Sequence, residues 1–324
     1  MMESLITSLA RKLYDLNPSL LHVPPANTDQ EDVICYNGPH GETSREAVIL
    51  CQDLPAALRC NVASWFLSPE QHVQESLIVL VVFGTLLYLV GPKLQRHLAD
   101  EGGRSYIQHP AYVRPLLALC FVVQLNYERL GRPEKLYFLL FPCNVIWLLV
   151  MTLCFGPNTW RPVALELICT YFILALVAMM VTPDTTDCMI LPGEAIFYFV
   201  SHSVLLLVPI LYLRNRSTTM RIPLSAHLWW WLASCAAFAI FYFVIVTIVS
   251  VGSGINLNYM MHPPPNQAIL EGKRYRWMSI ALCAIGFASS RVILRLLEVV
   301  LVPHKRIPAR RRRSSLASGK RKSI

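Results

Sequence analysis

Long apolar runs, separated by shorter polar segments, fill the chain from about residue 75 to residue 300. Each run holds roughly 18–25 residues, which is enough for an α-helix to cross about 30 Å of hydrocarbon. The runs occupy residues 75–92, 112–130, 136–156, 162–182, 194–213, 226–251 and 276–300. This pattern predicts an all-α membrane protein with about seven transmembrane helices. Polar side chains crowd the end of the second run, so six or eight helices also fit the pattern.

Two polar regions flank the predicted transmembrane bundle, which we place at residues 74–302. Residues 1–73 form a polar N-terminal region that begins with a short amphipathic helix, "MMESLITSLARKLYDL". No apolar run directly follows the charges of that helix, so it does not match a secretory signal peptide. Residues 303–324 form a basic tail that we expect to be disordered.

The composition agrees with a membrane protein, because 54% of the residues are hydrophobic and only 15% are charged. The net charge of +9 comes from the last 22 residues, which contain nine Lys or Arg residues and no acid. By the positive-inside rule, we expect a cytoplasmic C-terminal tail and, after seven helices, a luminal N-terminus. A basic segment tethered to a membrane binds lipid head groups, so we expect no nucleic-acid partner.

Two features of the termini and loops suggest a secretory-pathway membrane. The final residues "KRKSI" resemble a dilysine retrieval signal, which favours the endoplasmic reticulum or Golgi. The predicted orientation also places four cysteines in an oxidising lumen, where disulfides persist. These are Cys35, Cys51, Cys60 and Cys188, and their pairing stays open.

A cysteine and a histidine lie at matching depths in two of the predicted helices. Cys143 lies about seven residues into the third run, and His202 about eight residues into the fifth. At 1.5 Å per residue, both are roughly 10–12 Å below the luminal end of their helices. Other polar side chains gather at the same end. They are Gln124, Asn126, Asn144, Asn256, Asn258 and His262.

The opposite half of the bundle carries charges rather than amides. Glu166, Arg291, Arg295 and Glu298 lie near helix ends there. We expect the last three to pair with one another or to extend toward the membrane surface.

A thiol beside an imidazole is a minimal set for acyl transfer. The thiolate is the nucleophile, and a buried thiol needs a base to take its proton. His202 can supply that base, and nearby amides can stabilise an oxyanion. We expect Pro142 to open the helix beside Cys143. The alternative interpretation is that Cys143 packs as a small apolar side chain and His202 forms an inter-helix hydrogen bond.

Several stretches resemble the transmembrane protein 164 family: "YFLLFPCNVIWLL" (137–149), "LPGEAIFYFVSHSVLLLVPILYL" (191–213) and "INLNYM" (255–260). The resemblance covers about residues 112–300. It implies a lipid acyltransferase that acts on phospholipids, notably ether-linked phosphatidylethanolamine, with links to ferroptosis and autophagy. It also implies a relation to androgen-induced membrane hydrolases. The family's cysteine and intramembrane histidine fall on Cys143 and His202.

The Cys/His pair, together with what the resemblance implies, predicts a membrane O-acyltransferase or transacylase without a cofactor or metal. Its expected substrates are phospholipids and fatty acyl groups, and the acyl donor is either acyl-CoA or a phospholipid. Two other functions remain open. A lipid-ester hydrolase would use the same Cys/His pair with water as the acceptor, and a seven-helix receptor or transporter would use neither residue for catalysis.

Overall fold

The computed structural model describes the chain at residues 2–17, 21–22, 64–65, 67–101, 113–131, 133–180, 191–215, 224–254, 257, 260–261 and 274–301. These residues are almost all helical, which confirms the predicted all-α class. The exception is a parallel pair of two-residue strands, β1 (Leu21–His22) and β2 (Ser64–Trp65).

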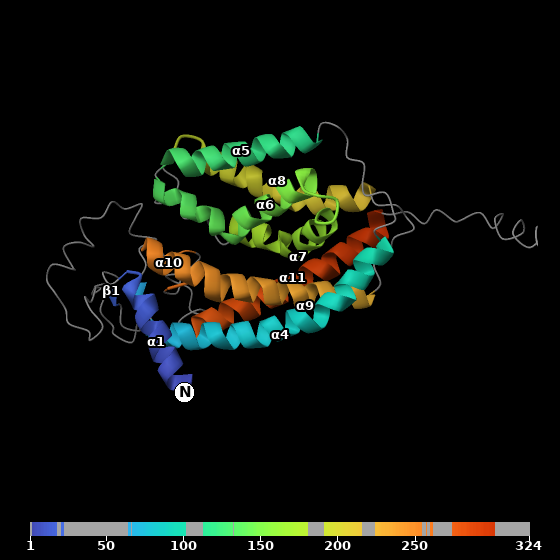
Figure 1. Ribbon diagram of the computed structural model, residues 1–324. Coiled ribbons are helices and arrows are strands. Elements are labelled where there is room, and N and C mark those ends of the chain that lie inside the picture. Colours follow the sequence, from blue (N-terminus) through green and yellow to red (C-terminus); the bar gives the residue numbers. More distant parts are fainter. Residues whose placement is uncertain are drawn as a thin grey trace, which may run out of the picture.

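A helix covers each of the apolar runs (Figure 1). The chain begins with α1 (Met2–Asp15), the amphipathic N-terminal stretch. The helices of the bundle are α4 (Pro69–Glu101), α5 (Val113–Gly131), α6 (Pro142–Phe155), α7 (Arg161–Met180), α8 (Glu194–Asn215), α9 (Leu224–Ile240), α10 (Thr247–Ser253) and α11 (Tyr275–Leu301).

Among the described residues, four helical segments are long and apolar enough to cross a membrane. They are Pro69–Leu98, Glu194–Tyr212, Leu224–Ser253 and Tyr275–Leu297, and two shorter apolar segments are Val113–Tyr127 and Pro142–Phe155. The surfaces of these helices expose large apolar side chains such as Val81 and Ile285, as expected beside lipid. A membrane crossing by all seven runs, and the orientation of the termini, stay predictions.

The bundle consists of two groups of helices that meet at α7 and α11 (Figure 1). One group contains α4, α9 and α11, and the other contains α5, α6, α7 and α8. Large apolar side chains from both groups fill the interior, including Trp147 of α6, Leu205 of α8 and Phe287 of α11. Tyr171 of α7 and Phe287 of α11 join the two groups, with ring centroids 4.9 Å apart.

We refer to the end of the bundle where α1 lies as the α1 end. α1 packs on α4 and α10 there, and α10 also contacts the segment that precedes α6. Because successive helices alternate in direction, α4, α6, α8 and α11 all begin at this end. Cys143 and His202 therefore both lie toward the α1 end, since each is near the beginning of its helix.

The third apolar run, 136–156, is not one continuous helix. A 3-10 helix, η1 (Pro133–Leu140), ends before Phe141, and α6 then begins at Pro142. The sixth run is also irregular, because a π-helix, η2 (Phe241–Val246), connects α9 to α10. Single turns of π-helix occur often at functional sites, and they leave backbone groups that other residues must satisfy.

A buried ion pair links α7 to α11 in the half of the bundle away from α1. Arg291 Nη1 donates to Glu166 Oε2 at 2.6 Å, and Nη2 donates to the Glu166 main-chain oxygen at 2.6 Å. Their side chains are 5% and 4% exposed. Our expectation that Arg291 would pair with its own helix or reach the surface was wrong. A buried arginine is satisfied better by a carboxylate on a neighbouring helix than by exposure to lipid.

Candidate functional site

Cys143 lies in the first turn of α6. Phe141 caps the helix with an extended backbone, at φ −63° and ψ 142°. Its carbonyl oxygen accepts hydrogen bonds from the N–H groups of Asn144 at 2.9 Å and Val145 at 3.0 Å. Pro142 occupies the first helical position, where a missing N–H costs nothing. The prediction that Pro142 opens a continuous helix was therefore wrong, because Pro142 instead begins one.

The position of Cys143 at the start of a helix favours a negative charge at or near its sulfur atom. Pro142 has no N–H group, and those of Asn144 and Val145 are bonded to Phe141, so the contribution of this helix end is mainly its dipole, which is positive there. A negative charge on the Cys143 sulfur, or on an oxygen attached to the carbon it attacks, is stabilised at such a place. The thiol is partly buried, and the neighbouring Asn144 is buried at 5% exposure.

His202 lies two turns into α8 and is 4% exposed. Its Nδ1 is 2.8 Å from the main-chain carbonyl oxygen of Tyr198, one turn earlier. The same oxygen accepts a hydrogen bond from the Ser201 hydroxyl at 2.9 Å. The Tyr198 ring lies against the imidazole, with centroids 4.0 Å apart and planes at 35°. Together these contacts fix the orientation of the imidazole.

The contact with Tyr198 also determines which nitrogen of His202 carries the proton. A carbonyl oxygen only accepts hydrogen bonds, so Nδ1 must be the N–H donor. In the neutral imidazole, Nε2 then carries a lone pair. Nε2 is buried and has no hydrogen-bond partner among the residues that the structure describes. His202 thus presents an available base inside the bundle.

Cys143 and His202 come from helices that pack on each other, α6 and α8. Both lie near one side chain, Tyr198. Its ring lies against His202, and its phenol is close enough to the Cys143 thiol for the two to interact electrostatically. Tyr198 was not predicted from the sequence, because it contributes a main-chain carbonyl and ring packing, and neither follows from the residue type at one position.

Of the other predicted site residues, Gln124 and Asn126 are among the residues that the structure describes. On α5, Gln124 is partly buried, whereas Asn126 is exposed and donates from Nδ2 to its own helix at the Val122 oxygen, 2.9 Å away. An amide that is bonded to its own helix and exposed is a poor oxyanion donor. Asn256, Asn258 and His262 lie outside the described residues, as do Cys35, Cys51, Cys60 and Cys188.

Two described residues of this stretch, Leu257 and Met260, contact helices at the α1 end. Leu257 is fully buried, and its N–H donates to the Ser250 hydroxyl at 3.2 Å. The Tyr275 hydroxyl donates to the main-chain oxygen of Met260 at 2.7 Å. These contacts tie Leu257 to α10 and Met260 to α11.

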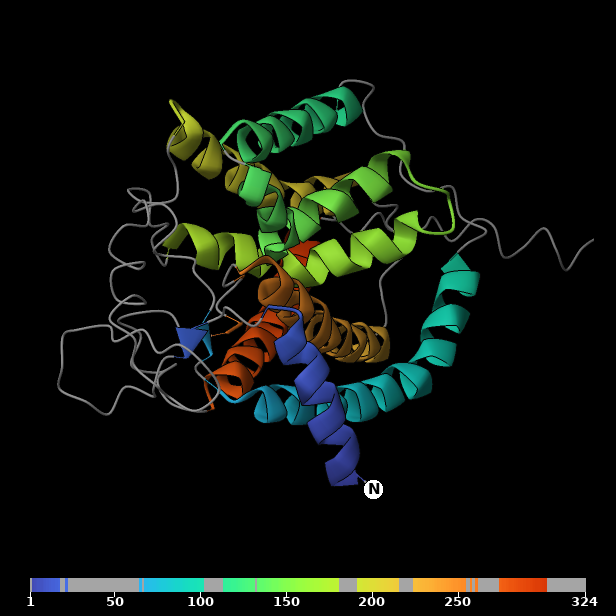
Figure 2. The same cartoon turned by 60° about the vertical axis from the view of Figure 1, so that its left-hand side comes forward.

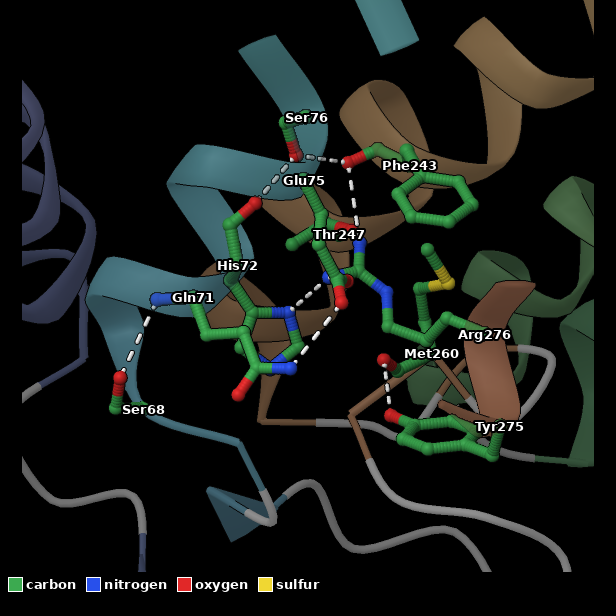
Figure 3. Close-up of polar contacts among 10 residues, drawn as sticks. All are labelled: Ser68, Gln71, His72, Glu75, Ser76, Phe243, Thr247, Met260, Tyr275 and Arg276. Atoms are coloured by element: carbon green, nitrogen blue, oxygen red, sulfur yellow. Dashed lines mark hydrogen bonds and ion pairs between the residues drawn. The ribbon is translucent and has the colours of Figure 1, made fainter. Parts of the chain in front are cut away.

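A second polar cluster at the α1 end was not predicted from the sequence (Figure 3). Arg276, in the first turn of α11, is fully buried. Its Nη1 donates to Glu75 Oε2 at 2.8 Å and to His72 Nδ1 at 2.7 Å, both on α4. Its Nη2 donates to the Thr247 hydroxyl of α10 at 3.0 Å. The cluster therefore joins α4, α10 and α11.

The same cluster satisfies the π-helix η2. The main-chain oxygen of Phe243 accepts a hydrogen bond from Ser76 Oγ of α4 at 2.7 Å and a longer one from Arg276 Nη2 at 3.5 Å. The guanidinium also lies over the Phe243 ring, 4.3 Å from its centroid. Contacts from two other helices thus hold the irregular backbone of η2 in place. His72, Glu75, Thr247 and Arg276 are all buried, and their bonds connect three helices, which is typical of a structural role.

A sequence signal for this cluster did exist. Glu75 and Arg276 stand at the first positions of two apolar runs, and both runs begin at the same end of the bundle. Opposite charges at matching depth are expected to pair when they cannot reach water. Charges at the edge of an apolar run, however, are most simply interpreted as marking its boundary.

Comparison with known proteins agrees with the resemblance. The model of the TMEM164 family matches residues 66–294, which also includes the first apolar run. A curated protein of Dictyostelium discoideum, described as "Transmembrane protein 164 homolog", is 29% identical over 215 residues, 62% of this chain and 74% of that protein. No solved structure matches. Because the family model covers more than half of the chain, the protein belongs to the TMEM164 family.

Proposed function

We propose that this protein is a membrane acyltransferase that moves a fatty acyl chain onto a lysophospholipid hydroxyl through a thioester on Cys143. The observation that carries the proposal is the hydrogen bonding of the two ring nitrogens of His202. Its Nδ1 is occupied by the Tyr198 carbonyl, so its buried Nε2 is the available base. Tyr198 lies beside both this imidazole and the Cys143 thiol.

In the first half-reaction, Nε2 of His202 takes the thiol proton and the Cys143 sulfur attacks the carbonyl carbon of the acyl donor. A C–S bond forms, and the bond from that carbon to the leaving group breaks. The leaving group takes the proton back from His202. The first turn of α6 stabilises the developing negative charge.

In the second half-reaction, the lysophospholipid hydroxyl attacks the thioester carbon. Its proton passes to Nε2 of His202, an ester C–O bond forms, and the C–S bond breaks. The thiol then recovers its proton from His202. Water in place of the lysophospholipid would release a free fatty acid, which is the hydrolase reaction.

Lipid substrates can approach this pair from within the membrane. On α8, Ile196, Phe199 and Val200 are exposed at 73%, 42% and 47%, whereas His202 is buried. The helix therefore has one exposed apolar face, which suits contact with lipid, and one face buried in the bundle. Lateral entry suits an acceptor with a long hydrocarbon chain. We take lysophosphatidylethanolamine with an ether-linked chain as the first acceptor, and acyl-CoA or a phospholipid as the donor, in the endoplasmic reticulum or Golgi.

The test is an assay of the purified full chain in lipid nanodiscs with defined lysolipids and isotopically labelled donors. We expect esterified product, and a covalent acyl group on Cys143 that neutral hydroxylamine releases. Cys143→Ala should abolish both signals. Cys120→Ala is the matched control, because Cys120 is also a partly buried thiol in a neighbouring helix, α5.

The possible results distinguish the proposed mechanism from the other candidate functions. Full transfer by Cys143→Ala would reject the thioester mechanism. Release of labelled fatty acid without consumption of lysolipid would identify a hydrolase. Binding of lysolipid without turnover of any donor tested would favour a receptor or transporter.

A further inference from the structure

The apolar face of α1 divides into two parts with different surroundings. Side chains on the inner part pack on the bundle: Ala10 is 1% exposed, and Leu13 and Tyr14 contact Val251 and Met261. On the outer part, Leu5 and Leu16 are 51% and 52% exposed. The helix is therefore apolar over a wider arc than its contacts with the protein cover.

Four residues of α1 and the turn that follows it form a stripe that the bundle leaves partly or fully exposed. Leu5, Leu9, Lys12 and Leu16 follow the spacing that places side chains on one helical face; Leu9 is half-buried, and Leu16 lies in the turn just after the helix. We call these four residues the outer stripe. Lys12 is exposed within it. A lysine among leucines lays its aliphatic stem along an apolar surface and extends its ammonium toward phosphate groups.

α1 crosses α4 at the height where we expect the membrane surface. Figure 1 and Figure 2 both show α1 crossing the beginning of α4 steeply instead of running along the bundle. The exposed residues at the beginning of α4 are polar, namely Ser68, Glu70 and Gln74. Exposed apolar side chains begin at Ile78. α1 therefore lies where the lateral surface of the bundle changes from polar to apolar.

We propose that α1 is an interfacial helix that lies in the phospholipid leaflet at the α1 end, with the outer stripe inserted at the boundary between head groups and acyl chains. Helices of this kind have one apolar face, basic residues beside it, and an axis in the plane of the membrane. α1 has an apolar face and the exposed basic residues Arg11 and Lys12, and its steep crossing of α4 matches the third feature. Its inner part binds α4 and α10, so it fixes the depth of the bundle in that leaflet.

The proposal is independent of any catalytic activity, and photo-crosslinking tests it directly. A photoreactive amino acid is placed at Leu5, Leu9 or Leu16 of the full chain, which is reconstituted in phosphatidylcholine vesicles. Ser4 and Ser8, on the polar face, are the matched control positions, and Ala10 reports packing on the bundle. Adducts are identified by mass spectrometry.

We expect phosphatidylcholine adducts from the outer stripe at several times the yield from Ser4 and Ser8, and protein adducts from Ala10. Equal lipid yields from the outer stripe and from Ser8 would overturn the proposal. Peptide adducts from Leu5 and Leu16 would also overturn it, because the stripe would then be covered by another part of this chain or by a second copy. The Ala10 adduct shows in each case that α1 is folded onto the bundle.

Discussion

The imidazole Nδ1 of His202 donates to the main-chain carbonyl oxygen of Tyr198 over 2.8 Å, within a single turn of α8. Because the partner is a backbone group, no side-chain substitution at residue 198 removes it directly. The tautomer of His202 is therefore built into the helix, and the other ring nitrogen, Nε2, is buried with its lone pair available. The predictions for the candidate site follow from this geometry.

Replacement of His202 with Gln should lower acyl transfer by about 10²- to 10⁴-fold, the usual contribution of a positioned general base. Only the neutral imidazole accepts a proton, so wild-type kcat/KM should also be lost as the pH falls and His202 becomes protonated. The measurement is the pH profile of both proteins. His227→Gln is the control, since His227 is also buried but lies at the start of α9, at the opposite end of the bundle. Near-normal turnover by His202→Gln would exclude His202 as the base.

Tyr198 should act through its ring more than through its hydroxyl group. Tyr198→Phe keeps the ring that lies 4.0 Å from the imidazole, whereas Tyr198→Ala removes it. We expect the alanine variant to lose most of its kcat with little change in KM, and the phenylalanine variant to lose much less. Tyr212→Phe, near the other end of α8, controls for removal of a buried phenol. Equal losses in the two Tyr198 variants would instead assign the main contribution to the phenol beside Cys143.

The sequence predicted the helices well because apolar runs directly report burial and lipid contact. It did not predict where those runs are interrupted. The 3-10 helix before Phe141 and the π-helix at Phe241–Val246 contain only apolar residues apart from Pro133, Glu134, Lys135 and two tyrosines. Their composition does not distinguish them from the α-helices around them. The π-helix is held by tertiary contacts, namely the bonds of Ser76 and Arg276 to the Phe243 oxygen, which the sequence of the run itself does not show.

The same limit applies to the candidate site. The alternation of helix direction was enough to predict Cys143 and His202 at one end of the bundle and at similar depth. It could not predict that α6 begins at Pro142, which places Cys143 at a helix N-terminus. It also could not identify Tyr198, whose role depends on a rotamer and a backbone oxygen. A catalytic role for the pair stays a prediction.

Breaking the Arg276–Glu75 pair should destabilise the bundle strongly. Removal of one partner leaves an uncompensated buried charge, which costs about 3–5 kcal/mol. Arg276→Met and Glu75→Gln should each lower the thermal unfolding temperature in detergent. The double variant should lose less than the combined loss of the single variants, because it leaves no charge unpaired. Simple addition of the two losses would show that the contact does not stabilise the protein as a pair.

Ser76 should stabilise the π-helix by a smaller amount. Its hydroxyl donates to the Phe243 oxygen at 2.7 Å, across the α4–η2 contact. Ser76→Ala removes this donor, and a hydrogen bond of this kind contributes about 0.5–1.5 kcal/mol. Ser289→Ala is the control, because the Ser289 hydroxyl is bonded only within its own helix, to the Ile285 oxygen at 2.9 Å. Equal unfolding temperatures for the two variants would mean that η2 does not depend on the Ser76 bond.

The two buried ion pairs on α11 should contribute independently to stability. Arg276 pairs with Glu75 near the α1 end, and Arg291 pairs with Glu166 in the other half of the bundle. The two arginines are about four turns apart on the helix, or roughly 22 Å. Effects of substitutions at such a distance, without shared partners, usually add to within about 0.5 kcal/mol. We therefore expect Glu75→Gln and Glu166→Gln to lower the unfolding free energy additively in a denaturant titration. A combined loss well below the added single losses would show that the bundle opens first at one end, so that only the pair at that end determines the measured stability.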